Sequence, residues 1–154
     1  KISDMPDLTY ITKSFNELTP FELYSLLRLR SAVFVVEQNC AYLDLDDKDQ
    51  QSFHVLAFHD HQLVAYTRCL PEGVSYEGSS SIGRVVIDPE YRDRKWGYEL
   101  MDYSMKKCRE RFGTHKITIS AQHHLQRFYE NCGFTAVGDV YLEDDIPHIK
   151  MIAA

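Results

Sequence analysis

The sequence predicts an α/β fold in one domain, with a mixed sheet flanked by helices on both of its faces. Short β-branched or alternating runs alternate along the chain with segments of helical periodicity, which is the pattern of such a fold. The length of 154 residues corresponds to a single domain, expected over residues 1–154. A hydrophobic content of 44% is ordinary for a globular chain of this size.

The first half of the chain predicts a strand, a helix and a β-hairpin. Residues 8–15 alternate like a strand, and Thr19-Pro20 then forms a capping-type opening with proline at the first helical position. Apolar residues continue at helical spacing up to Phe34. Residues 40–51 are polar and rich in aspartate, so we expect a solvated loop there. Two apolar strands joined at His59-Asp60-His61 then predict a hairpin.

The next segment predicts a strand, a basic turn and a helix. The run Val85-Val86-Ile87 is typical of a strand, and Asp88-Pro89 ends it because proline cannot continue a central ladder. A helical pattern begins near Lys95. The first N–H groups of a helix have no intrahelical partner, and the helix dipole adds about half a positive charge there. This order therefore indicates a pyrophosphate site, with a solvated mixed-charge turn as the alternative.

The last third predicts a strand over residues 117–122, a helix that ends at the C-cap Gly133, and two strands around the acidic turn 143–145. Together with the basic turn, this pattern resembles the GNAT superfamily of acetyl-CoA-dependent N-acyltransferases. Arg92 and Gly97 match the first and last positions of the family's Q/R-x-x-G-x-G/A loop. Lys95 stands where the family has its middle glycine, which departs from a cradle made of backbone alone.

A second motif narrows the resemblance. Residues 122–134 are similar to the family element N-x-x-A-x-x-F-Y-x-x-x-G-F, with Gln122 in the place of the asparagine. Residues 29–40 and 145–149 are similar to the ElaA-type branch of the superfamily. The resemblance extends over about residues 8–152 and implies a mostly antiparallel central sheet.

The resemblance also implies an acetyl transfer from acetyl-CoA to a primary amine by direct attack on the thioester. The expected cofactor contacts are Val85, Val86, Ile87, Arg92, Asp93, Arg94, Lys95, Trp96, Gly97, Tyr98 and Gln122. The strand backbone would bond the pantetheine amides, and an N–H group near Val86 or Ile87 would face the thioester carbonyl. A fixed donor at such a position contributes roughly 2.7–4 kcal/mol.

Tyr129 is the expected general acid, because it matches the tyrosine that the family places near the cofactor sulfur. A phenol titrates near about 10 and a thiol near about 8.5. Neutral Tyr129 can therefore donate a proton to the departing thiolate or hydrogen-bond it. The alternative is a structural tyrosine whose hydroxyl is satisfied elsewhere.

The base that takes the proton of the amine is less well defined. Glu37 follows the apolar run Phe34-Val35-Val36, where poor solvation would raise the pKa of its carboxyl group. A surface salt bridge is the alternative for Glu37, and a water relay also remains open. We expect an acidic acceptor pocket from residues 37–49 and the turn before His148. Further candidate bases are Asp44, Asp46, His54 and His148. The three arginines expected either to pair with these acids or to orient a substrate carboxylate are Arg30, Arg68 and Arg84.

Composition excludes several other classes of protein. A net charge of −6 argues against a general nucleic-acid binder and is compatible with a cationic amine. No apolar run approaches the about 20 residues of a membrane span, and no secretory signal is present. Four separated cysteines indicate reduced cytosolic thiols rather than a zinc site.

We therefore expect a cytoplasmic N-acetyltransferase that uses acetyl-CoA and a small-molecule or peptide amine. No metal, membrane or nucleic-acid partner is expected. A homodimer remains open. The alternative function is a non-catalytic sensor or scaffold that binds acetyl-CoA without turnover.

Overall fold

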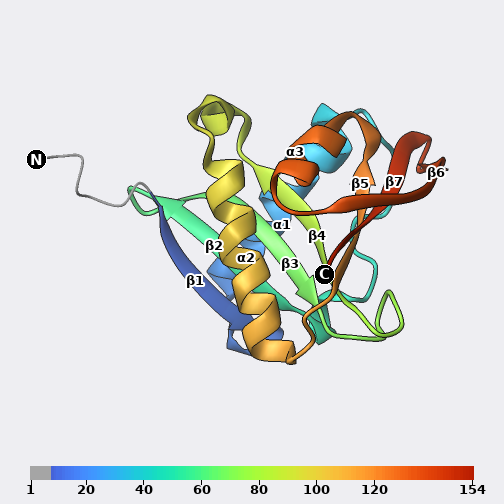
Figure 1. The fold of residues 1–154 in the computed structure, drawn as a ribbon. Helices are drawn as coiled ribbons and strands as arrows, with labels where there is room; N and C mark the ends of the chain where they lie inside the picture. Colours follow the sequence, from blue (N-terminus) through green and yellow to red (C-terminus); the bar gives the residue numbers. More distant parts are fainter. Residues whose placement is uncertain (1–7) are drawn as a thin grey trace, which may run out of the picture.

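The computed structural model describes residues 8–154, which form one seven-stranded sheet with helices on both faces (Figure 1). The strand order across the sheet is β1-β2-β3-β4-β5-β7-β6. The bounds are β1 Thr9–Ser14, β2 Phe53–His59, β3 Gln62–Leu70, β4 Ser80–Ile87, β5 Ile117–Gln122, β6 Thr135–Glu143 and β7 Ile146–Ala153. All neighbouring strands are antiparallel except β4 and β5, which are parallel. The predicted mixed, mostly antiparallel sheet is confirmed.

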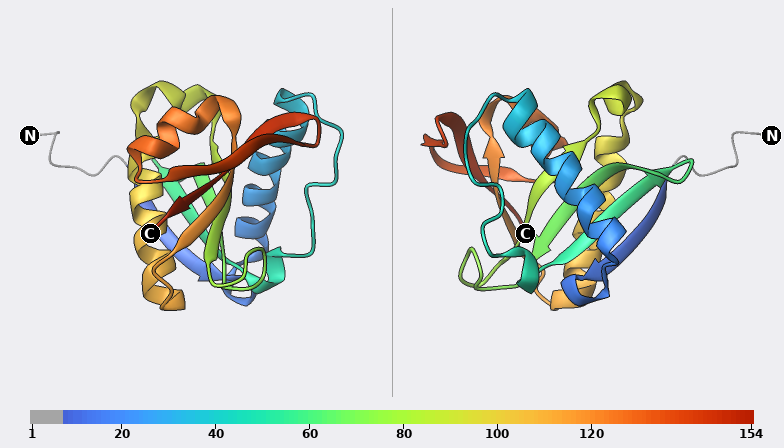
Figure 2. Two further views of the ribbon diagram at one scale, coloured as in Figure 1. Left: turned by 45° about the vertical axis from the view of Figure 1, so that its right-hand side comes forward. Right: turned by 180° about the vertical axis from the view of Figure 1, so that it is seen from behind.

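Two long helices cover opposite faces of this sheet. Helices α1 (Pro20–Arg30) and α2 (Trp96–Phe112) lie on opposite sides, as the front and rear views show (Figures 1 and 2). Each helix has its own core: Leu100 is buried between α2 and the sheet, whereas Leu26 belongs to a separate cluster beside α1. We call these the α2-side core and the α1-side core. The short helix α3 (Gln126–Asn131) follows β5.

The start of α1 follows the predicted capping box. Thr19 Oγ1 accepts a hydrogen bond from the N–H of Glu22 at 3.1 Å, and Glu22 Oε1 accepts one from the N–H of Thr19 at 2.8 Å. Pro20 occupies the first helical position, where its missing N–H costs nothing. After Arg30 the chain continues as the π-helical segment Ser31–Glu37, a distinction that helical spacing in the sequence does not make.

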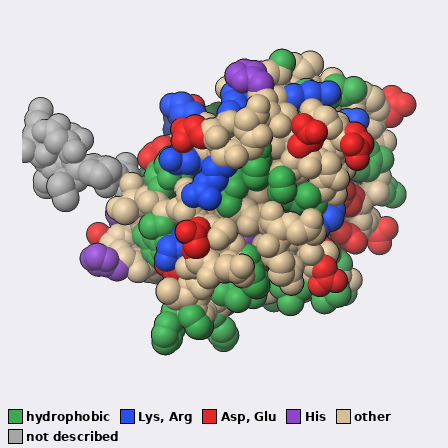
Figure 3. All heavy atoms as spheres, turned by 90° about the horizontal axis from the view of Figure 1, so that it is seen from below, with side chains coloured by type: hydrophobic (Ala, Val, Ile, Leu, Met, Phe, Trp, Pro, Cys, Tyr) green, Lys and Arg blue, Asp and Glu red, His purple; other side chains and the backbone are tan. Residues whose placement is uncertain are grey.

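The sheet ends at β6, an edge strand whose residues are mostly exposed and which pairs only with β7 among the described strands. The end of the molecule opposite the turn between β4 and α2 mixes acidic, basic and apolar side chains (Figure 3). None of the described helices combines the length and apolar character that crossing a membrane requires.

Candidate active site

Strands β4 and β5 pair only at their beginnings and then separate. The parallel ladder consists of Ser80 with Ile117 and Ser81 with Thr118. Beyond these residues β4 keeps only β3 as a paired neighbour among the described strands. On the side of β5, the backbone N–H and C=O groups of residues 85–87 therefore need partners other than a strand. The separation opens toward α3 and the turn before α2 (Figure 1).

A β-bulge shapes the same part of β4. Tyr66 pairs with Val86 and Arg68 pairs with Gly83, so two residues of β4 lie opposite one residue of β3. Arg84, inside the bulge, has a φ of 51°, a left-handed conformation that costs a non-glycine residue about 1 kcal/mol or more. Bulges change the direction of a strand and are common next to active sites.

The side chains of the predicted strand residues are used in the cores. Val85 and Ile87 pack against the α2-side core, and Val86 is buried in the α1-side core. Val85 and Ile87 are half-buried, and the polar groups that this stretch can offer a ligand are those of its backbone.

The N-terminus of α2 follows the basic turn directly. Lys95 is the N-cap and adopts φ 60° and ψ 21°, a conformation that glycine adopts without steric cost. The lysine therefore keeps a backbone shape suited to glycine and adds a positive charge to it. α2 extends over 17 residues, and the first N–H groups and the dipole of such a helix attract an anion.

Several predicted cofactor residues contribute mainly to packing. The Arg94 guanidinium lies 5.2 Å from the ring centroid of Trp96, and that ring is buried in the α2-side core. A Cβ atom at Gly97 would lie 3.1 Å from Cε1 of Phe128, so the close approach at this glycine is to α3. The Tyr98 hydroxyl accepts a hydrogen bond from Asn131 at 3.3 Å. Asp93 is exposed in the turn.

Arg92 forms a bidentate ion pair with Glu37, at the end of the π-helical segment. Its Nη1 and Nη2 donate to the two carboxylate oxygens at 2.7 and 2.6 Å. The hydrogen bonds from Arg92, together with its charge, lower the pKa of the Glu37 carboxyl group. The expectation of a raised pKa at Glu37 is therefore wrong, because the carboxylate is exposed and paired rather than buried beside the apolar run. A carboxylate held in this way is a poor base at neutral pH.

The pairing predicts that Glu37 competes with a pyrophosphate for Arg92. Exposed ion pairs contribute about 0.2–1 kcal/mol, so Glu37→Gln is expected to tighten acetyl-CoA binding up to about fivefold. Isothermal titration calorimetry measures this, with Glu90→Gln as the control because Glu90 is an exposed carboxylate in the same turn. Unchanged affinity together with slower turnover at neutral pH would contradict competition and favour Glu37 as the base.

Tyr129, on α3, is buried in the α2-side core. Its ring contacts Phe128 and Phe134 edge-on, at centroid distances of 5.0 and 6.0 Å. Burial, and to a smaller extent the nearby Cys132 thiol, raises the pKa of the Tyr129 phenol. Its hydroxyl makes no hydrogen bond to any other described residue, so a neutral donor is available there.

Residues 38–40, which follow the π-helical segment, contact the end of β5 and the turn between β6 and β7. Gln122 Nε2, at the end of β5, donates to Gln38 Oε1 at 3.3 Å. Cys40 Sγ donates to the Asp144 carbonyl oxygen, in the turn between β6 and β7, at 3.5 Å. The tip of this hairpin and the π-helical segment lie side by side in Figure 2, so the two form one side of the site.

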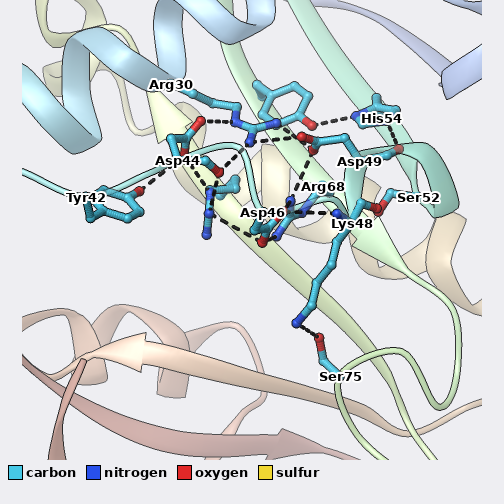
Figure 4. Close-up of polar contacts among 12 residues, drawn as sticks. Arg30, Tyr42, Asp44, Asp46, Lys48, Asp49, Ser52, His54, Arg68 and Ser75 are labelled. Carbon is cyan, nitrogen blue, oxygen red and sulfur yellow. Dashed lines mark hydrogen bonds and ion pairs between the residues drawn. The ribbon is translucent and has the colours of Figure 1, made fainter. Parts of the chain in front are cut away.

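The acidic loop has a different role from the one predicted. Three of its aspartates, Asp44, Asp46 and Asp49, bind arginines, whereas Asp47 is exposed (Figure 4). Arg30, fully buried, donates to Asp44 Oδ2 at 2.9 Å and to Asp49 Oδ1 at 2.7 Å. Arg68 forms a bidentate pair with Asp46 at 2.7 and 2.8 Å. The loop is therefore only partly solvated, and the pairing of Asp44, Asp46 and Asp49 with the arginines is confirmed. These carboxylates are engaged by arginines and do not form the expected acidic acceptor pocket.

The ion-pair network of Arg30 and Arg68 with the loop aspartates also includes Arg84 of the β4 bulge. Arg84 Nε donates to Asp44 Oδ1 at 2.7 Å, and its Nη2 donates to the Asp44 carbonyl oxygen at 2.8 Å. His54, another candidate base, lies inside the network: its Nε2 lies 3.0 Å from the Asp49 carbonyl oxygen, and its Nδ1 lies 2.6 Å from the Tyr66 hydroxyl. Burial lowers the pKa of His54. Both ring nitrogens are engaged, so His54 is not available to a substrate.

His148, one of the predicted candidate bases, belongs to a polar group on β5, β6 and β7 whose other members the sequence reasoning missed. Glu143 Oε1 accepts a hydrogen bond from Ser120 Oγ at 3.1 Å, and Ser120 is also bonded to the Tyr141 hydroxyl. The other oxygen of Glu143 lies 3.6 Å from Nε2 of His148. Alternation within each strand could have placed Ser120 and His148 on a face of the sheet, but their neighbours depend on strand register. Across residues 8–154, no three His, Cys, Asp or Glu side chains are grouped to hold a metal ion.

Comparisons with known proteins agree with this architecture. A family model described as an acetyltransferase (GNAT) domain matches residues 24–154. Protein ElaA of Escherichia coli K12 is 43% identical over 138 residues, covering 88% of this chain and 90% of ElaA. A UPF0039 protein of Schizosaccharomyces pombe is 39% identical over 149 residues, covering 96% of this chain and 97% of that protein. A crystal structure of an acyl-CoA N-acyltransferase from Pseudomonas aeruginosa has a TM-score of 0.89 at 44% identity, covering 96% of this chain and 99% of that one.

Proposed function

The chain belongs to the GNAT acetyltransferase family, among ElaA-like relatives, and we propose that it transfers the acetyl group of acetyl-CoA to a primary amine. The observation that carries the proposal is the separation of β4 from β5, with the N-terminus of α2 and the Tyr129 phenol on one side of it. Backbone donors, an anion site and a neutral acid are the groups that a transfer from a thioester to an amine needs.

The residues present fit the cofactor. The first N–H groups of α2, with Lys95 and Arg92, would hold the pyrophosphate. The free backbone edge of residues 85–87 and the Gln122 amide would hold the pantetheine arm. Bound acetyl-CoA supplies the activated acyl carbon. Trp96 and Arg94 support the turn through ring packing.

Different groups of the protein would contribute to different parts of the reaction. An N–H group of the β4 bulge region donates to the carbonyl oxygen on which negative charge develops. Tyr129 donates a hydrogen bond to the departing sulfur. Since burial raises the pKa of this phenol above that of a thiol, the hydrogen bond is favoured over complete proton transfer to the thiolate. Glu37 acts as the partner of Arg92 rather than as the base.

A test of the proposal is an acceptor screen with acetyl-CoA. Ethylamine, putrescine, benzylamine, amino acids and lysine-containing peptides are incubated with the protein, and products are identified by mass spectrometry. Calorimetry with Arg92→Gln measures the cofactor site separately and is expected to show weaker acetyl-CoA binding. Binding of acetyl-CoA without any acetylated amine would favour the sensor or scaffold function instead.

A further inference from the structure

We propose that Glu143 and His148 form the binding site for the ammonium group of the acceptor, and that Nε2 of His148 takes its proton. The inference deepens the proposed acetyl transfer and rests on it. The argument depends on the position of these two residues, on the tautomer of His148 and on the space between the two side chains.

The pair lies on the face of the sheet opposite Tyr129. Along β5 and β7, Ile119 and Ile149 are buried in the α2-side core together with Tyr129. Because successive strand residues point to opposite faces, Gln122 and His148 face the side of α1. These two residues are direct partners in the β5–β7 register, so His148 lies beside the end of the opening between β4 and β5. An acceptor at His148 would approach the opening from the face away from Tyr129.

The surroundings of His148 fix its tautomer. Its Nδ1 lies 2.7 Å from the carbonyl oxygen of Ile146, and a carbonyl oxygen can only accept a hydrogen bond. Nδ1 therefore carries the hydrogen, which leaves Nε2 of the neutral ring as a bare acceptor. The side chain is 8% exposed, so Nε2 is held in place by the surrounding structure.

Nε2 of His148 and the Glu143 carboxylate are two acceptors that face each other, and a ligand that donates hydrogen bonds to both can bridge them. The two atoms are 3.6 Å apart, beyond a hydrogen bond, and both are acceptors when the ring is neutral. Glu143 is held in position by Ser120 through its other oxygen. A primary ammonium has three N–H donors and can bond both acceptors at once, whereas a tertiary or quaternary ammonium cannot. This arrangement fits a primary or secondary alkylammonium and excludes a tertiary or quaternary one.

Both protons that the ammonium nitrogen loses in the transfer can be accounted for. One ammonium proton moves to Nε2 of His148, and the resulting imidazolium pairs with the Glu143 carboxylate. The neutral amine forms the new C–N bond while the C–S bond breaks and its electron pair goes to sulfur. The second proton lost by nitrogen completes the thiol, and His148 returns its proton to solvent. Two titratable side chains face His148, both from β6: Glu143, 3.6 Å from Nε2, and Tyr141, whose ring stacks on the imidazole at a centroid distance of 6.2 Å.

Nuclear magnetic resonance of ¹⁵N-histidine-labelled protein tests the site without turnover. Ethylammonium chloride is expected to shift the Nε2 resonance of His148, and tetramethylammonium chloride, which has no N–H donor, is expected to leave it unchanged. Glu143→Gln should abolish the shift. An Nε2–H tautomer in the free protein, or an equal response to both cations, would overturn the proposal.

One substitution of His148 and one control variant separate its chemical role from a structural one. Asparagine places its amide nitrogen near the position of Nδ1, so His148→Asn can keep the hydrogen bond to Ile146 while removing the base. It is expected to lower kcat by about 10²–10⁴-fold with the Kd for acetyl-CoA unchanged. Phe128→Leu, on the other face, is not expected to alter the ethylammonium response. Wild-type kcat in His148→Asn would refute the catalytic role. A wild-type protein that acetylates no amine, yet shows the ethylammonium shift, would refute the proposed function but not the cation site.

Discussion

Replacing Tyr129 with phenylalanine is expected to lower kcat by about 10²-fold or more and to leave acetyl-CoA binding unchanged. A positioned hydrogen-bond donor to developing negative charge contributes about 10²–10³-fold to a rate, and the hydroxyl is the only polar group that this substitution removes. The ring keeps its edge-on contacts with Phe128 and Phe134. Because the hydroxyl bonds no other described residue, the free energy of unfolding should change by less than about 0.5 kcal/mol.

The matched control for this prediction is Tyr103→Phe. Tyr103 is a partly buried tyrosine that packs against the same α2-side core, and its hydroxyl is bonded to Thr12 at 3.0 Å, away from β4 and β5. Loss of the Tyr103 hydroxyl should lower the free energy of unfolding and leave kcat unchanged. Steady-state and single-turnover kinetics of both variants distinguish the two roles. Equal single-turnover rates for wild type and Tyr129→Phe would remove Tyr129 from the mechanism.

Replacing Arg30 with methionine is expected to lower the free energy of unfolding by about 3–5 kcal/mol. Removal of one partner from a buried ion pair leaves the other charge uncompensated, which is among the most costly single substitutions. Arg30 is fully buried and serves both Asp44 and Asp49, whose side chains are 5% and 8% exposed. The control is Lys106→Met, because Lys106 pairs with Asp102 on the exposed face of α2. Urea unfolding should show a loss of at most about 1 kcal/mol for that control.

The same network predicts sensitivity to acid. Burial alone would raise the pKa of the Asp49 carboxyl group, but the hydrogen bonds and charges of Arg30 and Arg68 outweigh it and lower the pKa. A carboxyl group whose pKa is lower in the folded state contributes stability above its unfolded pKa of about 3.9, and that stability is lost as the pH falls through the folded value. Unfolding curves between neutral pH and pH 3 should therefore show a loss of stability below about pH 4 that Arg30→Met reduces. Parallel pH dependence in the two proteins would contradict this role of the network.

Much of the fold could be predicted because its signals are local. The capping box at Thr19, the proline that ends β4 and the glycine after α3 act within one turn of the chain. The anion site at the start of α2 depends on the same local order of strand, turn and helix. Lys95 could be recognised as a departure from the motif, but only the structure shows that the lysine keeps the left-handed backbone that a glycine would adopt.

The side-chain partners could not be predicted because they come from distant parts of the chain. Glu37 and Arg92 are 55 residues apart, and a glutamate after an apolar run looks buried until the pairing is known. The aspartates of the acidic loop look solvated because their arginines lie on α1, β3 and β4. His148 was one of several candidate bases, and only strand register and the Ile146 carbonyl distinguish it from His54.

The most direct test of the proposed function is the amine dependence of thiol release from acetyl-CoA. Free CoA and acetylated amine are quantified in the same sample, with and without the best primary amine from the acceptor screen. Direct transfer predicts that thiol release depends on the amine and equals the acetylated amine formed, mole for mole. Tight acetyl-CoA binding with thiol release that is absent, or that is the same with and without amine, would contradict an N-acetyltransferase.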